Sequence, residues 1–381
     1  MKILMVCTDF PYKSKNGTVV QGGGSACIAQ MVDGLLKKGH TIMIVTRFEK
    51  DNVGELFAIP IIRTKYIYLG FRESKITHAF FSLAAVRNAI RTFKPDIIHS
   101  HNPPAALTVS MALIGQKKTH VLTMHGPWSS VRLGGIKKKL AEQIEKIAVK
   151  KATTVACDSN ALAIEINEKY EVKTHAIQNA VDEFYFEKID KETAKDALGI
   201  HTTDRIALFT GRFVAEKGLD ILLQAASRIL KKRNNITFLL IGGGFDEKLV
   251  HEWLRNHVQY KNKILTIPFL EHERMKDAYS LADVFVLPSK AEGLSRSLME
   301  AMLFELPCIA TNVGGNVELL EEGRGILVKQ DANELADAID TILDKPEQTK
   351  KMAQKARSYV INNLTVEKRI NKLLTLYQSV I

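Results

Sequence analysis

Residues 284–311 read VFVLPSKAEGLSRSLMEAMLFELPCIAT and predict a strand, a turn, a helix and a second strand. The run 284–287 is apolar and rich in β-branched residues, as is typical of a buried parallel strand. Ser295 stands where a helix would begin, and apolar side chains recur at helical spacing through residues 298–303. Pro307 ends this helix before the next apolar run. The stretch therefore predicts one unit of a parallel α/β sheet.

Two carboxylates bracket the turn and the helix of this unit. Glu292 lies in the turn, and Glu300 lies inside the helix. The N–H groups of the first helical turn lie between them, and such a helix end attracts a phosphate through its unpaired donors and its dipole. An anion cradle flanked by two acceptors for sugar hydroxyls predicts a nucleotide-sugar site.

The carboxylate pair has two other interpretations. Glutamates are mostly exposed, so both could be solvated charges on a helix surface. They could also be the acid/base pair of a glycoside hydrolase. Eight helical residues span about 12 Å, whereas hydrolases hold their carboxyl groups about 5 Å apart or, in inverting enzymes, less than about 10 Å apart. The spacing disfavours the hydrolase.

Size and composition indicate an ordinary two-domain globular protein. The chain has 381 residues, 46% hydrophobic and 25% charged. Its four cysteines are scattered without a CxxC pair, which predicts reduced core thiols and a cytoplasmic location. The apolar start, MKILMVC, is too short for a signal peptide and fits a first strand, and no run approaches the length of a membrane span.

Positive charge is concentrated in the first half of the chain. Residues 1–185 hold 25 Lys and Arg against 15 Asp and Glu, whereas residues 186–381 hold 28 against 27. Residues 132–151 form a predicted basic helix with an apolar stripe, which could lie peripherally on the anionic inner face of a membrane or could pack its stripe on the core. The aromatic segment 66–81 could likewise meet an amphiphilic acceptor or a bilayer, or be ordinary packing. The chain lacks the interleaved aromatic and basic pattern of a single-strand groove, so no nucleic-acid partner is expected.

The first half reads as a doubly wound sheet. A strand at 2–8 leads through a glycine-rich turn to a helix at 25–38 and a strand at 41–46. Glycines in the turn let a ligand approach the backbone closely. Later strands end in polar residues at the carboxyl edge, where open α/β sheets bind ligands. The candidate ligand-binding residues in the glycine-rich turn and at these strand ends are Gly22, Gly23, Gly24, Ser25, His101, Asn102 and His125. A metal site from His99, His101 and His125 has no supporting carboxylate or cysteine, so no metal is expected.

The second half repeats the alternation after a polar junction at 183–204. Strands are predicted at 206–210, 236–241, 264–267, 284–287, 308–310 and 325–328. The fold class is therefore α/β, with two Rossmann-like doubly wound domains. We expect an amino-terminal domain at 1–185, completed by a last helix at 364–381, and a carboxyl-terminal domain at 186–363. If their carboxyl edges face each other across a cleft, the functional turns line that cleft.

Several short motifs then resemble one family, the retaining family-4 glycosyltransferases with the GT-B fold. The stretch from Glu292 to Glu300 resembles their E-x7-E element, including the frame PS-x-x-E-G and E-A-M-x-x-x-x-P. Other matches are Gly211-Arg212-Phe213 with Lys217-Gly218, Gly22-Gly23-Gly24, Thr123-Met124-His125-Gly126, Gln178-Asn179-Ala180-Val181-Asp182 and Gly314-Gly315-x-x-Glu318. The chain differs in having Gly293-Leu294-Ser295 where Gly-Phe-Gly is usual, and Ala180 where Gly is usual.

The resemblance implies a role for each matching residue. Arg212 and Lys217 would neutralise the leaving diphosphate, a charge that grows in the transition state. Glu300 would hold the ribose, Glu292 the transferred sugar, and His125 would contact the sugar near the reacting carbon. The remaining donor-side residues are Gly211 and Gly293, then Phe269 and Leu270 for the base edge, and Leu294, Ser295, Ser297 and Leu298 for the phosphate. The acceptor side would comprise residues 22–25, His101 and Asn102.

The sequence thus predicts a retaining glycosyltransferase. It would move a hexosyl or N-acetylhexosaminyl group from a nucleoside-diphosphate sugar, with UDP favoured, to a hydroxyl acceptor without a metal or other cofactor. A nucleotide-sugar 2-epimerase of the same architecture is the alternative, although it would carry further acid/base carboxylates. A non-catalytic nucleotide or nucleic-acid binder is a third possibility.

Overall fold

The computed structural model describes residues 1–20, 22–68, 73–126, 128–129, 135–182 and 187–381. The chain divides into two compact units, each described by itself. Unit 1 comprises Met1–Ala180 and Val366–Ile381, and unit 2 comprises Val181–Thr365. The boundary predicted at residue 185 lies outside the described residues, as do residues 132–134 of the predicted basic helix.

Unit 1 is built on a parallel sheet of seven strands in the order β10-β9-β8-β7-β1-β4-β6. Its strands are β1 (Lys2–Val6), β4 (Thr41–Arg47), β6 (Ile61–Thr64), β7 (Ile97–His101), β8 (His120–Met124), β9 (Thr154–Cys157) and β10 (Thr174–Ala176). Its helices are α1 (Gly23–Lys37), α2 (Glu73–Phe81), α3 (Leu83–Phe93), α4 (Asn102–Ala112), α5 (Gly135–Lys151), α6 (Asn160–Tyr170) and α15 (Val366–Gln378). A small antiparallel sheet joins β2 (Tyr12–Ser14), β3 (Val19–Val20) and β5 (Asn52–Gly54).

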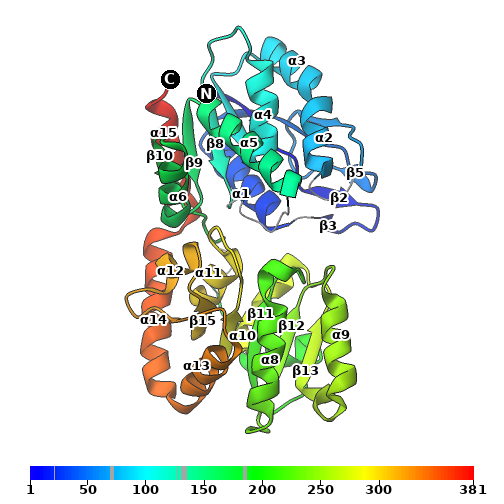
Figure 1. The fold of residues 1–381 in the computed structure, drawn as a ribbon, viewed down its shortest axis with the longest axis vertical. Helices are drawn as coiled ribbons and strands as arrows, with labels where there is room; N and C mark the ends of the chain where they lie inside the picture. Colours follow the sequence, from blue (N-terminus) through cyan, green and yellow to red (C-terminus); the bar gives the residue numbers. More distant parts are fainter. Residues whose placement is uncertain (21, 69–72, 127, 130–134, 183–186) are drawn as a thin grey trace. The chain divides into compact units, whose positions relative to one another are not determined.

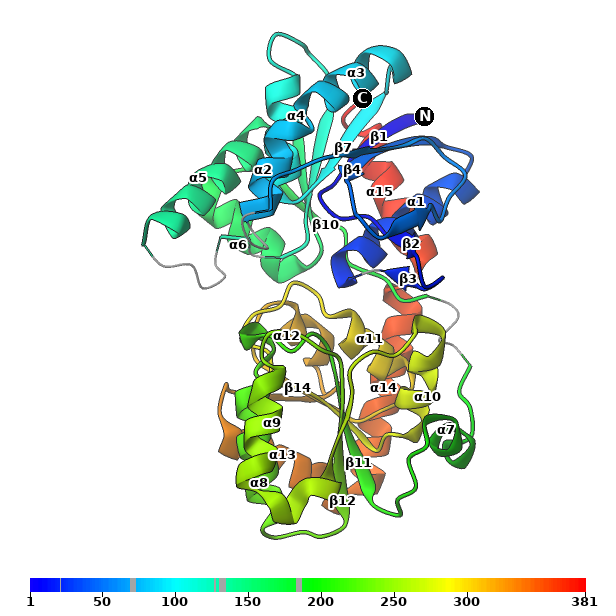
Figure 2. The same ribbon diagram turned by 90° about the vertical axis from the view of Figure 1, so that its right-hand side faces the viewer.

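Helices cover both faces of this sheet. Helices α1 and α15 share one core with β1, β4 and β7, and the two helices lie side by side (Figure 2). Gly34 of α1 makes that approach possible, because a Cβ there would lie 2.5 Å from Cγ1 of Ile370. Helices α3, α4, α5 and α6 pack on the other face, and α2 contacts α4.

Unit 2 contains a parallel sheet of six strands in the order β13-β12-β11-β14-β15-β16. Its strands are β11 (Arg205–Thr210), β12 (Ile236–Ile241), β13 (Ile264–Ile267), β14 (Val284–Leu287), β15 (Cys308–Thr311) and β16 (Ile326–Val328). Its α-helices are α7 (Lys191–Leu198), α8 (Leu219–Leu230), α9 (Glu247–Asn256), α10 (Met275–Leu281), α11 (Arg296–Leu303), α12 (Gly315–Leu320), α13 (Ala332–Asp344) and α14 (Pro346–Asn363), and the 3-10 turns are η2 (Ala215–Lys217), η3 (Val258–Lys263) and η4 (His272–Arg274). Helices α8, α9 and α13 lie on one face and α10, α11 and α14 on the other (Figure 1).

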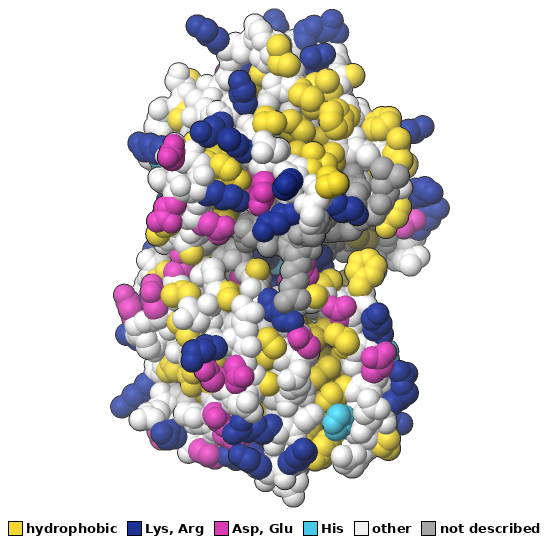
Figure 3. Space-filling model, viewed as in Figure 1, with side chains coloured by type: hydrophobic (Ala, Val, Ile, Leu, Met, Phe, Trp, Pro, Cys, Tyr) yellow, Lys and Arg dark blue, Asp and Glu magenta, His cyan; other side chains and the backbone are white. Residues whose placement is uncertain are grey.

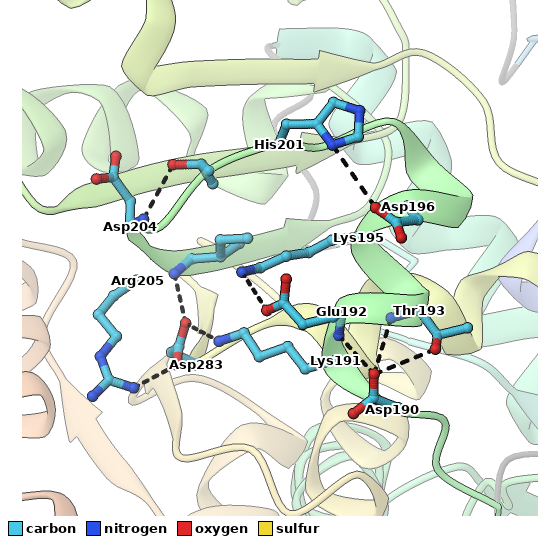
Figure 4. A network of polar contacts seen from close by, with 12 residues as sticks. Asp190, Lys191, Glu192, Thr193, Lys195, Asp196, His201, Asp204, Arg205 and Asp283 are labelled. Carbon is cyan, nitrogen blue, oxygen red and sulfur yellow. Dashed lines mark hydrogen bonds and ion pairs between the residues drawn. The ribbon is translucent and has the colours of Figure 1, made fainter.

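The predicted strands and the α/β class are confirmed, and the polar stretch 183–204 contains a helix that was not predicted. Helix α7 forms inside it. Asp190 caps α7 by accepting from the N–H groups of Glu192 and Thr193 at 3.1 Å each (Figure 4). Asp283 then binds Lys191 Nζ at 2.7 Å and Arg205 Nη1 at 2.9 Å, which ties the helix to the sheet. The sequence pattern did not predict α7, because this helix is rich in charged residues and packs through ion pairs as well as through apolar side chains.

No helix in the described ranges has both the length and the apolar character needed to cross a bilayer.

Candidate active site

The site in unit 2 lies at the point where the strand order of the sheet reverses. From β11 the chain moves to β12 on one side, while β14 pairs with β11 on the other. The turns that leave the carboxyl ends of such neighbours diverge and open a crevice that binds ligands in α/β sheets. The two turns touch here, because the Lys290 N–H donates to the Glu216 carbonyl at 2.7 Å.

Lys217 and Glu292 meet across these turns. Lys217 Nζ lies 2.6 Å from Glu292 Oε1, and their side chains are 19% and 10% exposed. Ser289 Oγ donates to the same carboxylate oxygen at 2.6 Å. The ammonium carries three donors, so it can hold Glu292 and an anionic oxygen at once.

Glycines bring a third turn against this pair. A Cβ on Gly314 would lie 2.1 Å from the Glu292 carbonyl oxygen, and one on Gly315 would lie 2.1 Å from that of Gly293. The Gly315 N–H donates to the Gly293 carbonyl at 2.8 Å. On the other side, a Cβ on Gly218 would lie 1.9 Å from the Pro288 carbonyl oxygen. The turns after β11, β14 and β15 can therefore close on one another only without side chains at these positions.

Helix α11 starts beside the same turn. Ser295 is its N-cap, and its hydroxyl accepts from the Leu298 N–H at 3.4 Å. The Leu298 N–H, which the sequence assigned to phosphate, is thus engaged by the cap. Ser297 Oγ lies 3.2 Å from Ser295 Oγ. The positive end of the helix dipole lies at this start.

Glu300 is buried one turn further along α11. Tyr279 Oη donates to its Oε2 at 2.8 Å, and Arg296 Nη2 lies 3.6 Å from its Oε1. Arg296 also reaches Asp182 Oδ2 at 3.1 Å, and His272 Nε2 lies 3.4 Å from that same oxygen. Burial raises the pKa of Glu300, against the opposing effects of the Arg296 charge and the Tyr279 hydroxyl.

The other predicted donor-side residues surround this centre less tightly. Arg212 is exposed on the turn after β11, and Gly211 approaches the Lys217 side chain. Phe269 is 63% exposed, whereas Leu270 packs half-buried against the core of unit 2. Leu294 is buried. The structure thus brings Lys217, Glu292 and the start of α11 together.

Unit 1 has its own polar edge, built from the ends of three neighbouring strands. His101 ends β7, His125 follows β8 and Asp158 follows β9. His125 Nδ1 lies 2.7 Å from Asp158 Oδ2, and His125 Nε2 lies 3.0 Å from His101 Nδ1. Because a carboxylate only accepts, His125 donates from Nδ1, and in its neutral form Nε2 accepts from His101. Asn102 has a positive φ of 67°, and its Oδ1 accepts from the His125 N–H at 3.1 Å.

Helix α15 completes this edge with a buried cation. Arg369 Nη2 lies 3.6 Å from Asp158 Oδ1, and both side chains are 1% exposed. Arg369 Nη1 also donates to the Cys27 carbonyl of α1 at 3.2 Å. Burial lowers the pKa values of His99 and His101 far below the ordinary value, and the nearby histidines and Arg369 add to this shift. Both imidazoles are therefore neutral.

The glycine-rich turn begins α1 instead of preceding it, so the helix predicted at 25–38 starts earlier. Gly22 is the N-cap, and Gly23 and Gly24 form the first turn. The Gly22 N–H donates to Ser25 Oγ at 2.8 Å, and that hydroxyl lies 3.0 Å from the Gly22 carbonyl.

Sequence reasoning missed four residues of these edges: Asp158, Tyr279, Arg296 and Arg369. Asp158 directly follows a strand, as His125 does, and this position was the available signal. The cap of the following helix is Ser159, which accepts from the Leu162 N–H, so Asp158 is left for His125. Tyr279 and Arg369 lie inside helices and gave no signal. Across the described residues, no group of three or more His, Cys, Asp or Glu side chains could hold a metal ion.

Comparisons with known proteins identify the family of the chain. The family model described as Glycosyltransferase Family 4 matches residues 21–183, and the model described as Glycosyl transferases group 1 matches residues 190–359. The chain belongs to the family-4 glycosyltransferases. It is 26% identical to the alpha-maltose-1-phosphate synthase of Mycolicibacterium smegmatis, with 100% of both chains covered.

Solved structures share the fold of this glycosyltransferase. Sucrose-phosphate synthase from Thermosynechococcus elongatus matches with a TM-score of 0.86 at 20% identity, covering 100% of this chain and 98% of that one. HepE of Anabaena, in complex with UDP-glucose, matches with a TM-score of 0.78 at 19% identity and 100% coverage of both chains. The two doubly wound parallel sheets are those of the GT-B fold, and the enzyme catalyses glycosyl transfer.

Proposed function

We propose that this enzyme is a retaining glycosyltransferase that takes a hexosyl or N-acetylhexosaminyl group from a UDP-sugar to a hydroxyl acceptor without a metal. One observation carries the proposal. Lys217 and Glu292 are paired at 2.6 Å beside the capped start of α11. A cation, a helix N-terminus and a carboxylate at one sheet edge are the groups that a sugar diphosphate requires.

The chemistry follows from where charge develops. As the bond between sugar and phosphate breaks, negative charge grows on the leaving diphosphate. Lys217 and Arg212 would stabilise that charge, and the α11 dipole would add to their effect. Glu292 would accept from hydroxyls of the transferred sugar while it holds the ammonium in place.

Glu300 would hold the ribose of the donor. Its carboxylate is fixed by Tyr279 and approached by Arg296, so its remaining acceptor positions are oriented before the donor arrives. The preference for UDP is supported by the UDP-glucose in the HepE structure.

Unit 1 would recognise the acceptor through His101, Asn102 and residues 22–25, and His125 would contact the transferred sugar near the reacting carbon. Asp158 would orient His125 by accepting from its Nδ1. We further propose a cytoplasmic enzyme that contacts the inner face of the membrane through residues 132–151. The described part of this segment, α5, supports the contact with the exposed residues Ile136, Lys137, Lys138, Lys139 and Leu140.

A thermal-shift screen against nucleotide sugars tests the donor. We expect UDP-hexose or UDP-N-acetylhexosamine to raise the melting temperature more than GDP-mannose, and EDTA to leave the shift unchanged. The product formed with an acceptor should keep the anomeric configuration of the donor, as measured by NMR. Conversion of UDP-N-acetylglucosamine to an isomer without any acceptor would instead indicate the epimerase.

A further inference from the structure

Helices α2 and α3 of unit 1 expose a surface that the proposed reaction does not use. A shallow groove of about 550 Å³ runs along it, lined by Leu83 and by six residues that we call the α2–α3 face: Phe80, Phe81, Ala84, Arg87, Asn88 and Arg91. Phe80 is 58% exposed and Phe81 is 51% exposed.

The α3 part of this face is a single helical stripe. Ala84, Arg87, Asn88 and Arg91 follow i, i+3, i+4, i+7 spacing and point outward. The opposite stripe of Val86, Ala89 and Ile90 is buried against the sheet. The core therefore fixes α3 so that both arginines are exposed and line the same groove as the two phenyl rings.

Charge around the face is mostly positive. Residues 73–118 contain Lys75, Arg87, Arg91, Lys94, Lys117 and Lys118 and two acids, Glu73 and Asp96. Asp96 accepts from the backbone N–H of Lys2 at 2.8 Å, and Lys75 pairs with Asp9 at 2.6 Å. The other five cations are exposed, and within the described residues none of them forms an ion pair with an acid.

Apolar side chains continue past the face. Ile114, just beyond α4, is 75% exposed. Arg87 Nη2 donates to the Met111 carbonyl of α4 at 3.3 Å, which places the end of α4 beside the stripe. Figure 3 shows hydrophobic side chains gathered over this part of unit 1, with Lys and Arg side chains around them.

We propose that the α2–α3 face binds the surface of an anionic lipid bilayer. Exposed phenyl rings enter the interfacial layer, and the arginines and nearby lysines meet lipid phosphates. The sign of the charge disfavours a second copy of the chain, because a two-fold interface would press this cationic surface against itself.

This proposal differs from the contact through residues 132–151. Helix α5 carries two acids, Glu142 and the buried Glu145, and its exposed apolar residues Ile136, Leu140 and Ile147 include no aromatic ring. Exposed phenyl rings beside two arginines fit an anionic interface better. Substitutions in each segment can distinguish their contributions to membrane binding.

Co-sedimentation of the full-length chain with vesicles tests the proposal. The probes are phosphatidylcholine vesicles with and without phosphatidylserine, and no donor or acceptor is present. The wild type should bind only the anionic vesicles. F80S/F81S and R87Q/R91Q should each weaken this binding about tenfold or more. Only R87Q/R91Q should also flatten the salt dependence.

Matched controls lie on unit 2. Phe245 is 83% exposed, and Lys231 and Lys232 are exposed after α8, so F245S and K231Q/K232Q should bind as the wild type does. The donor-induced thermal shift should stay normal in all variants, which shows that they are folded. The proposal is overturned if the wild type does not bind anionic vesicles, if only K137Q/K138Q/K139Q loses binding, or if the face variants merely abolish a dimer seen by light scattering. None of these outcomes bears on glycosyl transfer.

Discussion

The two units use the same doubly wound sheet but build its polar edge from different chemistry. Unit 2 places an ion pair, Lys217 with Glu292, at the turns where its strand order reverses. Unit 1 places the neutral histidines His99 and His101 at the end of β7 and buries the Asp158–Arg369 ion pair beside them. The scaffold supplies the positions, and the residues that follow each strand determine the chemistry.

The two edges also differ in how deeply their ion pairs are buried. The side chains of Lys217 and Glu292 keep some contact with solvent, whereas those of Asp158 and Arg369 are almost fully covered. Changes in unit 2 should therefore affect turnover with little effect on folding. Changes in unit 1 should affect the stability of that unit first. The chain has two tryptophans, Trp128 in unit 1 and Trp253 in unit 2, so each unit can be followed in a variant that keeps only its own indole.

The largest effect is expected from Lys217→Ala. Removing one cation from a developing diphosphate charge should lower kcat by about 100- to 1,000-fold, by analogy with the loss of a single transition-state donor. The measurement is steady-state turnover at saturating donor.

Lys290→Ala is the matched control. Lys290 lies on the adjoining turn and pairs with Asp220 at 2.6 Å, away from Glu292. A similar loss in both variants would mean that any lysine on these turns supports the rate, and the role given to Lys217 would be wrong.

The second effect concerns stability in unit 1. Asp158→Asn leaves the Arg369 charge buried without its counterion, so unfolding of unit 1 should become easier by about 3 kcal/mol. Urea unfolding followed through Trp128 in a Trp253→Phe background measures this change.

Asp33→Asn provides the comparison for that variant. Asp33 pairs with Lys37 on the exposed side of α1, where an ion pair contributes under about 1 kcal/mol. Equal destabilisation by the two substitutions would contradict the distinction between buried and exposed pairs, and so would a fall in unit 2 stability with Asp158→Asn.

Lowering the pH should change the stabilities of the two units in opposite directions. Burial lowers the pKa of His78 to about 4 and that of His120 to about 3, and it lowers those of His99 and His101 as well. The unfolded chain protonates its histidines near pH 6.5, so unit 1 has its full stability above that pH and loses about 2 kcal/mol per histidine by pH 5. The described residues of unit 2 include no buried histidine.

The Glu300 contribution to stability depends on pH with the opposite sign. Its raised pKa means that the folded state binds a proton more readily than the unfolded chain, so the Glu300 contribution to unit 2 stability improves as pH falls toward 4.5. Urea titrations at pH 7 and pH 5, followed through each tryptophan, should show Trp128 responding first. Simultaneous loss of both signals would show that the units unfold together.

The smallest effect is expected from Glu300→Gln. The amide keeps the shape but loses a charged acceptor, which should weaken donor binding about tenfold. Unit 2 should be no less stable at pH 7, because the buried charge is removed. Isothermal titration with the donor measures the affinity, and Glu321→Gln on the exposed end of α12 is the control. Unchanged affinity would remove Glu300 from the donor site.

The sequence predicted what depends on local pattern and missed what depends on distant partners. The runs 206–210 and 284–287 were identifiable because a strand covered on both faces is continuously apolar. Strand β6 was missed because its short sequence, IIRT, is only half buried. The Lys217 and Glu292 turns were recognisable because each directly follows a strand. Arg369 could not be connected with Asp158, because only tertiary packing brings α15 to β9.

The division of the chain has a consequence for biosynthesis. Val181 and Thr365 form a β-bridge, so unit 2 enters and leaves at one point and sits as an insertion within unit 1. Unit 2 is continuous and can fold as soon as it leaves the ribosome. Unit 1 must wait with one side of its sheet open until α15 is synthesised, because Ile370, Leu373 and Tyr377 belong to its core. We therefore expect the half of the chain that is translated first to be the last to finish folding.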